Sequence, residues 1–282
     1  MGVINHFKTV LLLGALTGLL LWVGQAVGGA GGLTFAIAIV LIMNVGTYFF
    51  SDKIVLKMHH AIEVEKDHHL YKMVDRLRKK AHLPMPKVYR LPTGTPNAFA
   101  TGRNPNHATV AATDGILSLL NEDELEGVIA HELTHVKNRD TLIATIAASV
   151  AGIISYVAMM ARWAAIFGGM GGDDRNGNPF EFIVLALLTP LIASLIQFAI
   201  SRSREYLADE GGAKISGKPQ ALASALKKIH NGIAHHPMKP SSNNKATASL
   251  FIENPFRGEN LMNLFSTHPP MKKRVARLEA MK

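Results

Sequence analysis

The longest apolar stretches of the chain predict membrane-spanning helices. No charged residue occurs between Lys8 and Asp52, a gap too long for one span of about 20 residues and suited to two. Two further charge-free stretches follow later in the chain. Pro190 falls inside the last of them, where a membrane helix tolerates it with a kink. The predicted spans are Thr9–Val27, Leu33–Phe50, Thr141–Ala161 and Phe182–Ile200.

Two of these assignments have alternatives. The first stretch, preceded by Lys8, also suits a signal peptide, but a second apolar run follows at once, which favours a retained anchor. The last two stretches would also suit helices buried in a protein core, although their length and lack of charge favour spans.

The charged residues predict which side of the membrane each segment occupies. Lysine and arginine concentrate between Asp52 and Lys80, whereas the turn at Gly28–Gly32 has neither. The positive-inside rule therefore places both termini and residues 52–140 in the cytoplasm. The net charge of +9 suits a surface beside anionic lipid headgroups, and no nucleic-acid-binding motif occurs, so nucleic acid is not an expected partner. The absence of cysteine excludes disulfides and thiolate metal ligands.

The remaining segments alternate between short β-type runs and helical patterns. Residues 52–82 are charged and predicted to be helical, and residues 236–247, rich in proline, serine and asparagine, suit a flexible loop. Predicted strands are Lys87–Leu91, Thr95–Thr101 and His107–Ala112. Predicted helices are Ser201–Glu210, which Gly211–Gly212 would stop, Gln220–His230 and Met271–Met281.

The sequence His131-Glu-Leu-Thr-His135 is an H-E-x-x-H motif in a segment that the sequence predicts to be helical. Asn121 suits the N-cap, and Glu124 three residues later completes a capping box. Residues four apart on a helix lie about 6 Å apart along the axis, so two imidazoles can converge on one Zn²⁺ ion. Glu132 can then act as general base toward a water molecule. The alternative is a pair of ordinary histidines on a solvated face.

A third metal ligand elsewhere in the chain decides between a zinc site and a pair of ordinary histidines. Asn138 and Thr141 stand where one zincin class has its third histidine and following glycine, which excludes that class. The best candidate is Glu205, because an antiparallel hairpin of the last two spans returns it to the two histidines. Asp209, one turn later, could accept the N–H of a ligand imidazole.

These patterns predict a mainly α fold with a small β-sheet, an α+β zincin or gluzincin-type catalytic domain joined to four transmembrane helices. The catalytic part is divided by the second pair of spans. The expected segments are an N-terminal transmembrane hairpin (1–51), a first catalytic part (52–140), a second transmembrane hairpin (141–200) and a second catalytic part with the third ligand (201–282).

Four motifs together resemble the HtpX family of bacterial membrane metalloproteases, which is related to the CAAX prenyl proteases. They are His131-Glu-Leu-Thr-His135, Ser201-Arg-Ser-Arg-Glu-Tyr-Leu-Ala-Asp209, Asn97-Ala-Phe-Ala-Thr-Gly102 and Ser266-Thr-His-Pro-Pro270. The resemblance implies an endopeptidase with one zinc ion per subunit in the cell inner membrane, acting in stress response on misfolded or damaged membrane proteins or unfolded polypeptides. It assigns His131, His135 and Glu205 as ligands and Glu132 as base.

The resemblance also implies that an edge strand, Asn97, Ala98, Phe99 and Ala100, pairs with the substrate backbone. His268 would donate a hydrogen bond to a developing oxyanion or would be a structural residue beside a turn. Arg202 and Arg204 could instead take that oxyanion role, but they are expected to anchor lipid headgroups. Two other functions are a processing peptidase of CAAX-protease type with narrow specificity and a non-catalytic membrane scaffold. No feature of the sequence indicates an oligomeric state.

Overall fold

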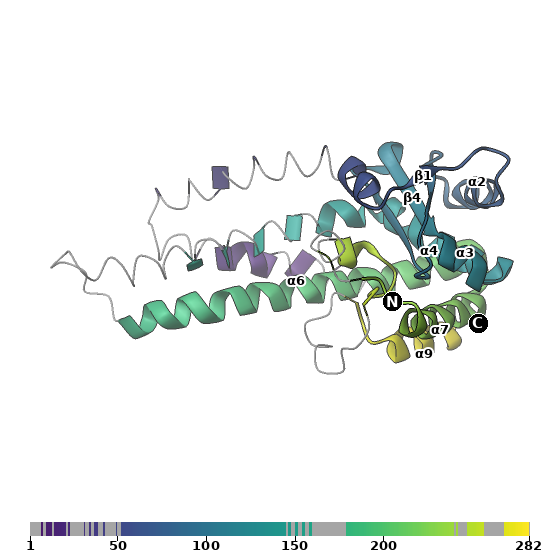
Figure 1. Cartoon of the computed structure of the whole chain (residues 1–282). Helices are drawn as coiled ribbons and strands as arrows, with labels where there is room; N and C mark the ends of the chain where they lie inside the picture. Colours follow the sequence, from purple (N-terminus) through teal and green to yellow (C-terminus); the bar gives the residue numbers. More distant parts are fainter. Residues whose placement is uncertain are drawn as a thin grey trace.

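The computed structural model describes residues 52–144, 179–239, 247–256 and 268–281, together with scattered shorter pieces. These pieces are residues 7, 10–12, 14–20, 22, 31, 34, 37–38, 42, 49, 146–147, 150–151, 154–155, 158–159 and 241. The described part is mainly helical and contains one small sheet, as the sequence predicts (Figure 1).

Four short strands form a mixed sheet in the order β1-β2-β4-β3. β2 and β4 are parallel, whereas β1–β2 and β3–β4 are antiparallel, so β1 and β3 lie at the edges. All three predicted strands are present, but β3 begins after Thr95 and Pro96, because proline has no N–H for a ladder. The strands are β1 (Ile62–Glu63), β2 (Lys87–Leu91), β3 (Ala98–Gly102) and β4 (Ala108–Thr113).

Several helices pack against the sheet, and one long helix extends away from it. The long helix α6 (Pro179–Ser216) begins far from the compact part and runs into it, where α4 (Glu122–Asn138) and the sheet lie (Figure 1). The labelled α-helices of the described residues are α2 (His69–Ala81), α3 (Asp114–Leu119), α4 (Glu122–Asn138), α6 (Pro179–Ser216), α7 (Pro219–His235) and α9 (Met271–Glu279). Short 3-10 helices are η1 (Pro105–His107) and η3 (Ala248–Leu250).

The prediction of one helical region over residues 52–82 is wrong. Residues 52–58 and α2 are helical, but strand β1 separates them. His60 has a φ of 51°, a left-handed conformation that ends the first helical segment. Ile62 and Glu63 then pair with Arg90 and Tyr89 of β2. Strand β1 forms through this long-range pairing, and it is too short to show a periodic pattern in the sequence.

Helix α4 begins as its sequence predicts. The Asn121 side chain accepts a hydrogen bond from the backbone N–H of Glu124 (2.9 Å), and the Glu124 carboxylate accepts one from the Asn121 N–H (3.0 Å). This capping box satisfies two backbone donors at the helix start. At the other end Arg139 is left-handed, with a φ of 55°, so the chain turns sharply after Asn138. The turn brings Asp140 back beside His135, where its carboxylate forms a contact described below.

The predicted helix stop at Gly211–Gly212 is also wrong, because α6 continues through both glycines to Ser216. A Cβ atom on Gly212 would lie 2.8 Å from the backbone N and Cα of His131, and one on Gly211 would overlap the Thr134 side chain. The glycines therefore let α6 approach the backbone of α4 closely.

Helix α4 is central to the main hydrophobic core. It packs against α2, α6, α7 and β3. The core cluster includes Leu77 of α2, Val110 of β4, Ile129 of α4, Leu226 of α7 and Leu278 of α9. Residues that precede position 141 and residues that follow position 200 thus share one core, so the two parts that the sequence separates fold together.

A second, smaller hydrophobic cluster lies among the predicted spans. It contains Leu16, Leu20, Ala147, Ala151, Ile154, Ala193 and Ile200. Helix α6 contains the predicted fourth span and passes through Pro190 without a break. Most of the second predicted span, parts of the first and third, and residues 240 and 242–246 of the predicted loop lie outside the described residues. Among the residues that are described, no helix is long and apolar enough to cross a membrane.

The substitution Gly212→Ala should destabilise the protein. Alanine improves helix propensity by about 1 kcal/mol, but overpacking against a helix backbone typically costs about 1–3 kcal/mol. Thermal unfolding of the purified protein should therefore show a lower Tm. Gly14→Ala is the control, because nothing lies within 4 Å of a Cβ atom there. A Tm equal to or above that of the unsubstituted protein would refute the close approach of α4 and α6.

Candidate metal centre

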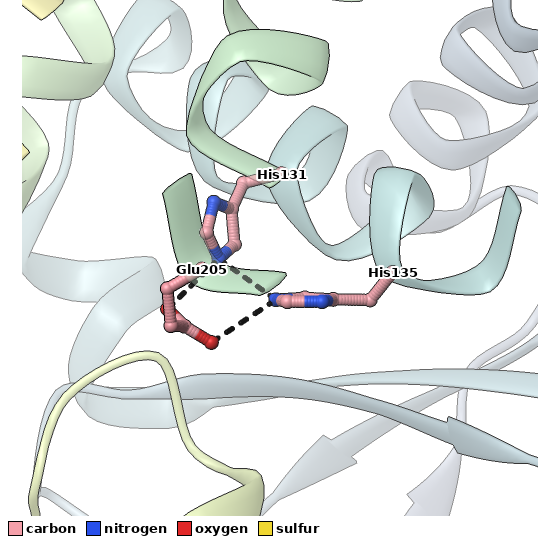
Figure 2. Close-up of side chains that lie close together, drawn as sticks. All are labelled: His131, His135 and Glu205. Carbon is pink, nitrogen blue, oxygen red and sulfur yellow. Dashed lines mark hydrogen bonds and ion pairs between the residues drawn. The ribbon is translucent and has the colours of Figure 1, made fainter. Parts of the chain in front are cut away.

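Three side chains from α4 and α6 converge on one point. His131 and His135 lie one turn apart on α4, and their Nε2 atoms are 3.1 Å apart. Glu205 of α6 places Oε1 3.4 Å from the Nε2 of His135 and Oε2 3.7 Å from the Nε2 of His131 (Figure 2). The three donor groups lie within 4.8 Å of one another. The structure thus brings together the three residues that the sequence selects as ligands.

Each histidine contacts a carboxylate through its other ring nitrogen. The Nδ1 of His131 lies 3.0 Å from Oδ1 of Asp209, as the sequence predicts. The Nδ1 of His135 lies 2.8 Å from Oδ2 of Asp140, a contact that sequence reasoning misses. A carboxylate on Nδ1 holds the proton there and leaves Nε2 as a lone-pair donor. Both imidazoles are therefore oriented with Nε2 toward Glu205.

Asp140 is in turn held by Arg204 of α6. The Nε of Arg204 donates to Asp140 Oδ1 at 2.5 Å, and its Nη2 forms an ion pair with the same oxygen. Arg204 is only 4% exposed, so the expectation that it anchors lipid headgroups is wrong. The sequence gives one indication of the ion pair between Asp140 and Arg204. Asp140 lies five residues after the ligand His135, and Arg204 directly precedes the ligand Glu205.

Arg274 of α9 joins the centre from the C-terminal end of the chain. Its side chain is fully buried and donates to both oxygens of Asp209, at 2.7 and 2.9 Å. Its Nη1 lies 3.2 Å from Oε2 of Glu205 and donates to the carbonyl of Ile252 at 2.9 Å. One guanidinium thus compensates two carboxylates, a role that the helical pattern around Arg274 does not indicate.

The charges around the centre change the pKa values of its groups. Burial opposes ionisation of Glu205, but Arg274 and then His268 hold its pKa well below the usual range. Burial lowers the pKa of His131. Burial also disfavours the charged form of His135, yet Asp140 and Glu205 raise its pKa to about 9. The carboxylates of Asp140 and Glu205 stabilise positive charge at His135. They therefore also favour a metal cation bound to the imidazole in place of the proton.

The buried polar atoms and the charge balance fit a divalent cation. Among the described residues, the buried Oε1 of Glu132 and Oε2 of Glu205 have no hydrogen-bond partner. Four carboxylates and two guanidinium groups leave an excess of two negative charges when all are ionised. The carboxylates belong to Glu132, Glu205, Asp209 and Asp140, and the guanidinium groups to Arg204 and Arg274. Two imidazoles and one carboxylate could hold a metal ion.

Glu132 lies beside the three donors and is 1% exposed. Burial raises the pKa of Glu132 to about 7, against the lowering effect of His135. The backbone of Ala100 in β3 hydrogen-bonds to Glu132 and also lowers the pKa. Ala100 thereby ties the edge strand to the centre. A carboxyl group whose pKa lies near neutrality can both accept and release a proton.

The predicted substrate strand and His268 lie next to the centre. The carbonyl of Ala98 accepts a hydrogen bond from the Ile252 N–H (3.0 Å), and the Asn97 side chain donates to the carbonyl of Glu253 (2.8 Å). The first part of the β3 edge is thus paired within the chain. His268 is 6% exposed, with Nδ1 3.6 Å from Oε2 of Glu205. The roles predicted for the strand and for His268 stay predictions.

A buried pair of histidines, a carboxylate and an adjacent glutamate on this motif define the class of metal-dependent peptidases. Residues 65–282 match peptidase family M48, and the chain belongs to this family. It is 54% identical over 278 residues to the "Protease HtpX homolog" of Syntrophotalea carbinolica, covering 98% of this chain and 99% of that protein. The homolog from Pyrococcus furiosus is 53% identical over 280 residues, with 99% and 96% covered.

The fold agrees with this membership. The crystal structure of S. mikatae Ste24p matches with a TM-score of 0.59 and 19% identity, over 98% of this chain. The chain spans 66% of the length of that protein, and at this identity the likeness shows the fold. The family resemblance read from the four motifs is confirmed, and the chain is a metalloprotease.

The substitution Arg274→Met should strongly destabilise the metal-free protein, because it leaves Asp209 and Glu205 buried without their guanidinium partner. Removing one partner of a buried ion pair costs about 3–5 kcal/mol. Denaturant unfolding in the presence of a chelator measures the loss. Lys273→Met on the exposed face of α9 is the matched control and should change little. Equal stability of the two variants would show that Arg274 does not compensate the carboxylates.

Proposed function

We propose that this protein is a zinc endopeptidase embedded in the cell inner membrane that hydrolyses peptide bonds of misfolded or damaged membrane proteins at the cytoplasmic face. The observation that carries the proposal is the convergence of His131, His135 and Glu205 beside the buried Glu132. Unfolded polypeptides would also be substrates. The names of the HtpX-type relatives support a protease.

Each residue of the centre has a proposed role. His131, His135 and Glu205 would hold one zinc ion per subunit. When bound, zinc supplies Lewis acidity, which polarises a carbonyl group and makes a water molecule more acidic. Glu132 accepts the proton of the attacking water and passes it to the amine that leaves when the C–N bond breaks. Asp209 keeps the imidazole of His131 in the tautomer that binds metal.

The substrate backbone would lie along the β3 edge. Ala100 contacts Glu132 and lines the same cavity as His135 and Glu205, so a chain added to the strand there passes the centre. Strand addition binds a substrate mainly through hydrogen bonds to its backbone and less through its side chains, so it suits many different substrates. Asn97 and Ala98 would support this strand through their bonds to Glu253 and Ile252. His268 would donate to the developing oxyanion.

The membrane arrangement follows from the charge-free stretches. Segments 1–51 and 141–200 would be transmembrane hairpins, and segments 52–140 and 201–282 would be the two catalytic parts, with both termini in the cytoplasm. The centre then lies close to the bilayer, because Asp140 contacts His135 and directly precedes the third predicted span. This position favours substrates that are anchored in the same membrane.

Two alternatives keep the fold and change the function. A processing peptidase of CAAX-protease type would cleave one kind of protein tail, and a non-catalytic scaffold would bind partners without hydrolysis. The scaffold is disfavoured by the buried Glu132, since burying an acid with one oxygen, Oε1, left without a hydrogen-bond partner is costly for a protein that does not use it. A panel of unrelated unfolded substrates separates broad from narrow cleavage.

The substitution Glu132→Gln should abolish cleavage and leave zinc binding intact, because the side chain acts on protons and is not a ligand. We expect at least a 100-fold loss of casein hydrolysis, typical of a lost general base. Metal content measured on the same sample supplies the control. Substantial cleavage by Glu132→Gln would exclude this residue as the base, and simultaneous loss of zinc would make it a ligand.

The chain lacks cysteine, so single cysteines report the topology. Lys137→Cys and Lys214→Cys, at exposed positions of the catalytic parts, should react with an impermeant thiol reagent from the cytoplasmic side only. A cysteine at Gly177, between the third and fourth predicted spans, should react from the opposite side only. Reaction of Lys137→Cys and the Gly177 variant from the same side would contradict two crossing helices.

A further inference from the structure

A cavity of about 140 Å³ opens directly beside the metal centre. His135, Glu205 and Ala100 are among the residues that line it, so the cavity adjoins the atoms that would surround a cleaved bond. Other lining residues come from the start of the third predicted span and from the end of the fourth and the residue after it. Its lining residues there are Thr141, Ala144, Ala147, Gln197, Ile200 and Ser201.

We propose that this cavity binds one apolar side chain of the substrate, of the size of leucine, methionine or phenylalanine, next to the cleaved peptide bond. The inference rests on the proposed function and names the substrate residue that the site selects. The cavity is the specificity pocket of the enzyme, and its walls, Ala147 and Ile200, set its depth.

The size of the cavity fits such a side chain. An apolar cavity of roughly 150 Å³ in another protein holds a benzene molecule, so about 140 Å³ admits a branched aliphatic chain or a single ring. Ala147 and Ile200 are 1% exposed and belong to the second hydrophobic cluster, so the wall behind them is packed protein. A small side chain, such as alanine, would leave most of the space without contacts.

The charges around the cavity disfavour a charged occupant. Arg204 and Asp140, which also line it, are 4% and 5% exposed and are ion-paired with each other. Glu205 faces Arg274 and is a proposed ligand. With a divalent cation bound at the centre, a lysine or glutamate of the substrate would therefore lose its hydration beside groups that are already neutralised. The polar atoms of Gln197 and Ser201 do not supply a compensating charge.

The position of the cavity agrees with substrates that lie in the membrane. Its apolar wall comes from residues that the sequence assigns to the ends of two spans, so the pocket lies between the centre and the bilayer. A substrate segment that emerges from the bilayer carries apolar side chains at this level. One of them enters the pocket while the backbone lies along β3.

The test is the cleavage profile of unfolded casein, read by mass spectrometry of the new termini. The zinc-loaded wild-type enzyme should cut where leucine, methionine or phenylalanine occupies one fixed position beside the bond. Ala147→Leu fills the pocket and should lower the ratio of cuts at large to cuts at small residues roughly 10-fold or more. Ile200→Ala enlarges the pocket and should shift the cuts toward aromatic residues.

Ala151→Leu is the matched control, because Ala151 is buried in the same cluster one turn further along and does not line the cavity. It should keep the wild-type profile. Where Ala147→Leu does not fold, Ala144→Leu narrows the cavity from an exposed position. A wild-type profile in Ala147→Leu or Ala144→Leu, or the same shift in Ala151→Leu, overturns the pocket and leaves the protease intact. No cleavage by the zinc-loaded wild type overturns both.

Discussion

The close packing of α6 against α4 is the contact on which the rest of the structure depends. Gly212 lies against the backbone of His131, and a side chain there would push the helices apart. At this separation Glu205, two turns earlier on α6, reaches both histidines of α4. The same packing aligns Asp209 with His131, so ligand and supporting carboxylate come from one helix face.

Compensation of buried negative charge is the second constraint. The carboxylates that orient the histidines would repel one another without Arg274 and Arg204, which come from α9 and α6. Arg274 also binds the carbonyl of Ile252, whose N–H bonds to Ala98 of β3. The C-terminal helix thus supports both the metal centre and the edge strand. The remaining excess of negative charge is what a divalent cation would neutralise.

The sequence predicted features that depend on neighbouring residues and missed those that depend on tertiary contacts. The capping box of α4 and the motif histidines are local, and Glu205 was found because the spacing of apolar stretches predicts a hairpin. From the neighbouring residues alone, Gly211–Gly212 is predicted to end a helix. Packing against α4 instead makes both glycines part of α6. Asp140, Arg204 and Arg274 carry no periodic signal, and strand β1 exists only through its pairing with β2.

Zinc K-edge X-ray absorption, with metal content from the same sample, tests the central claim most directly. The wild-type protein should contain one zinc ion per chain, with two imidazole ligands and oxygen donors, and no sulfur. In Glu205→Ala the zinc affinity should fall and the oxygen contribution should decrease, because only His131 and His135 are left. A wild-type affinity and an unchanged spectrum in Glu205→Ala would contradict the account, since the packing of α6 on α4 would then not build the metal site.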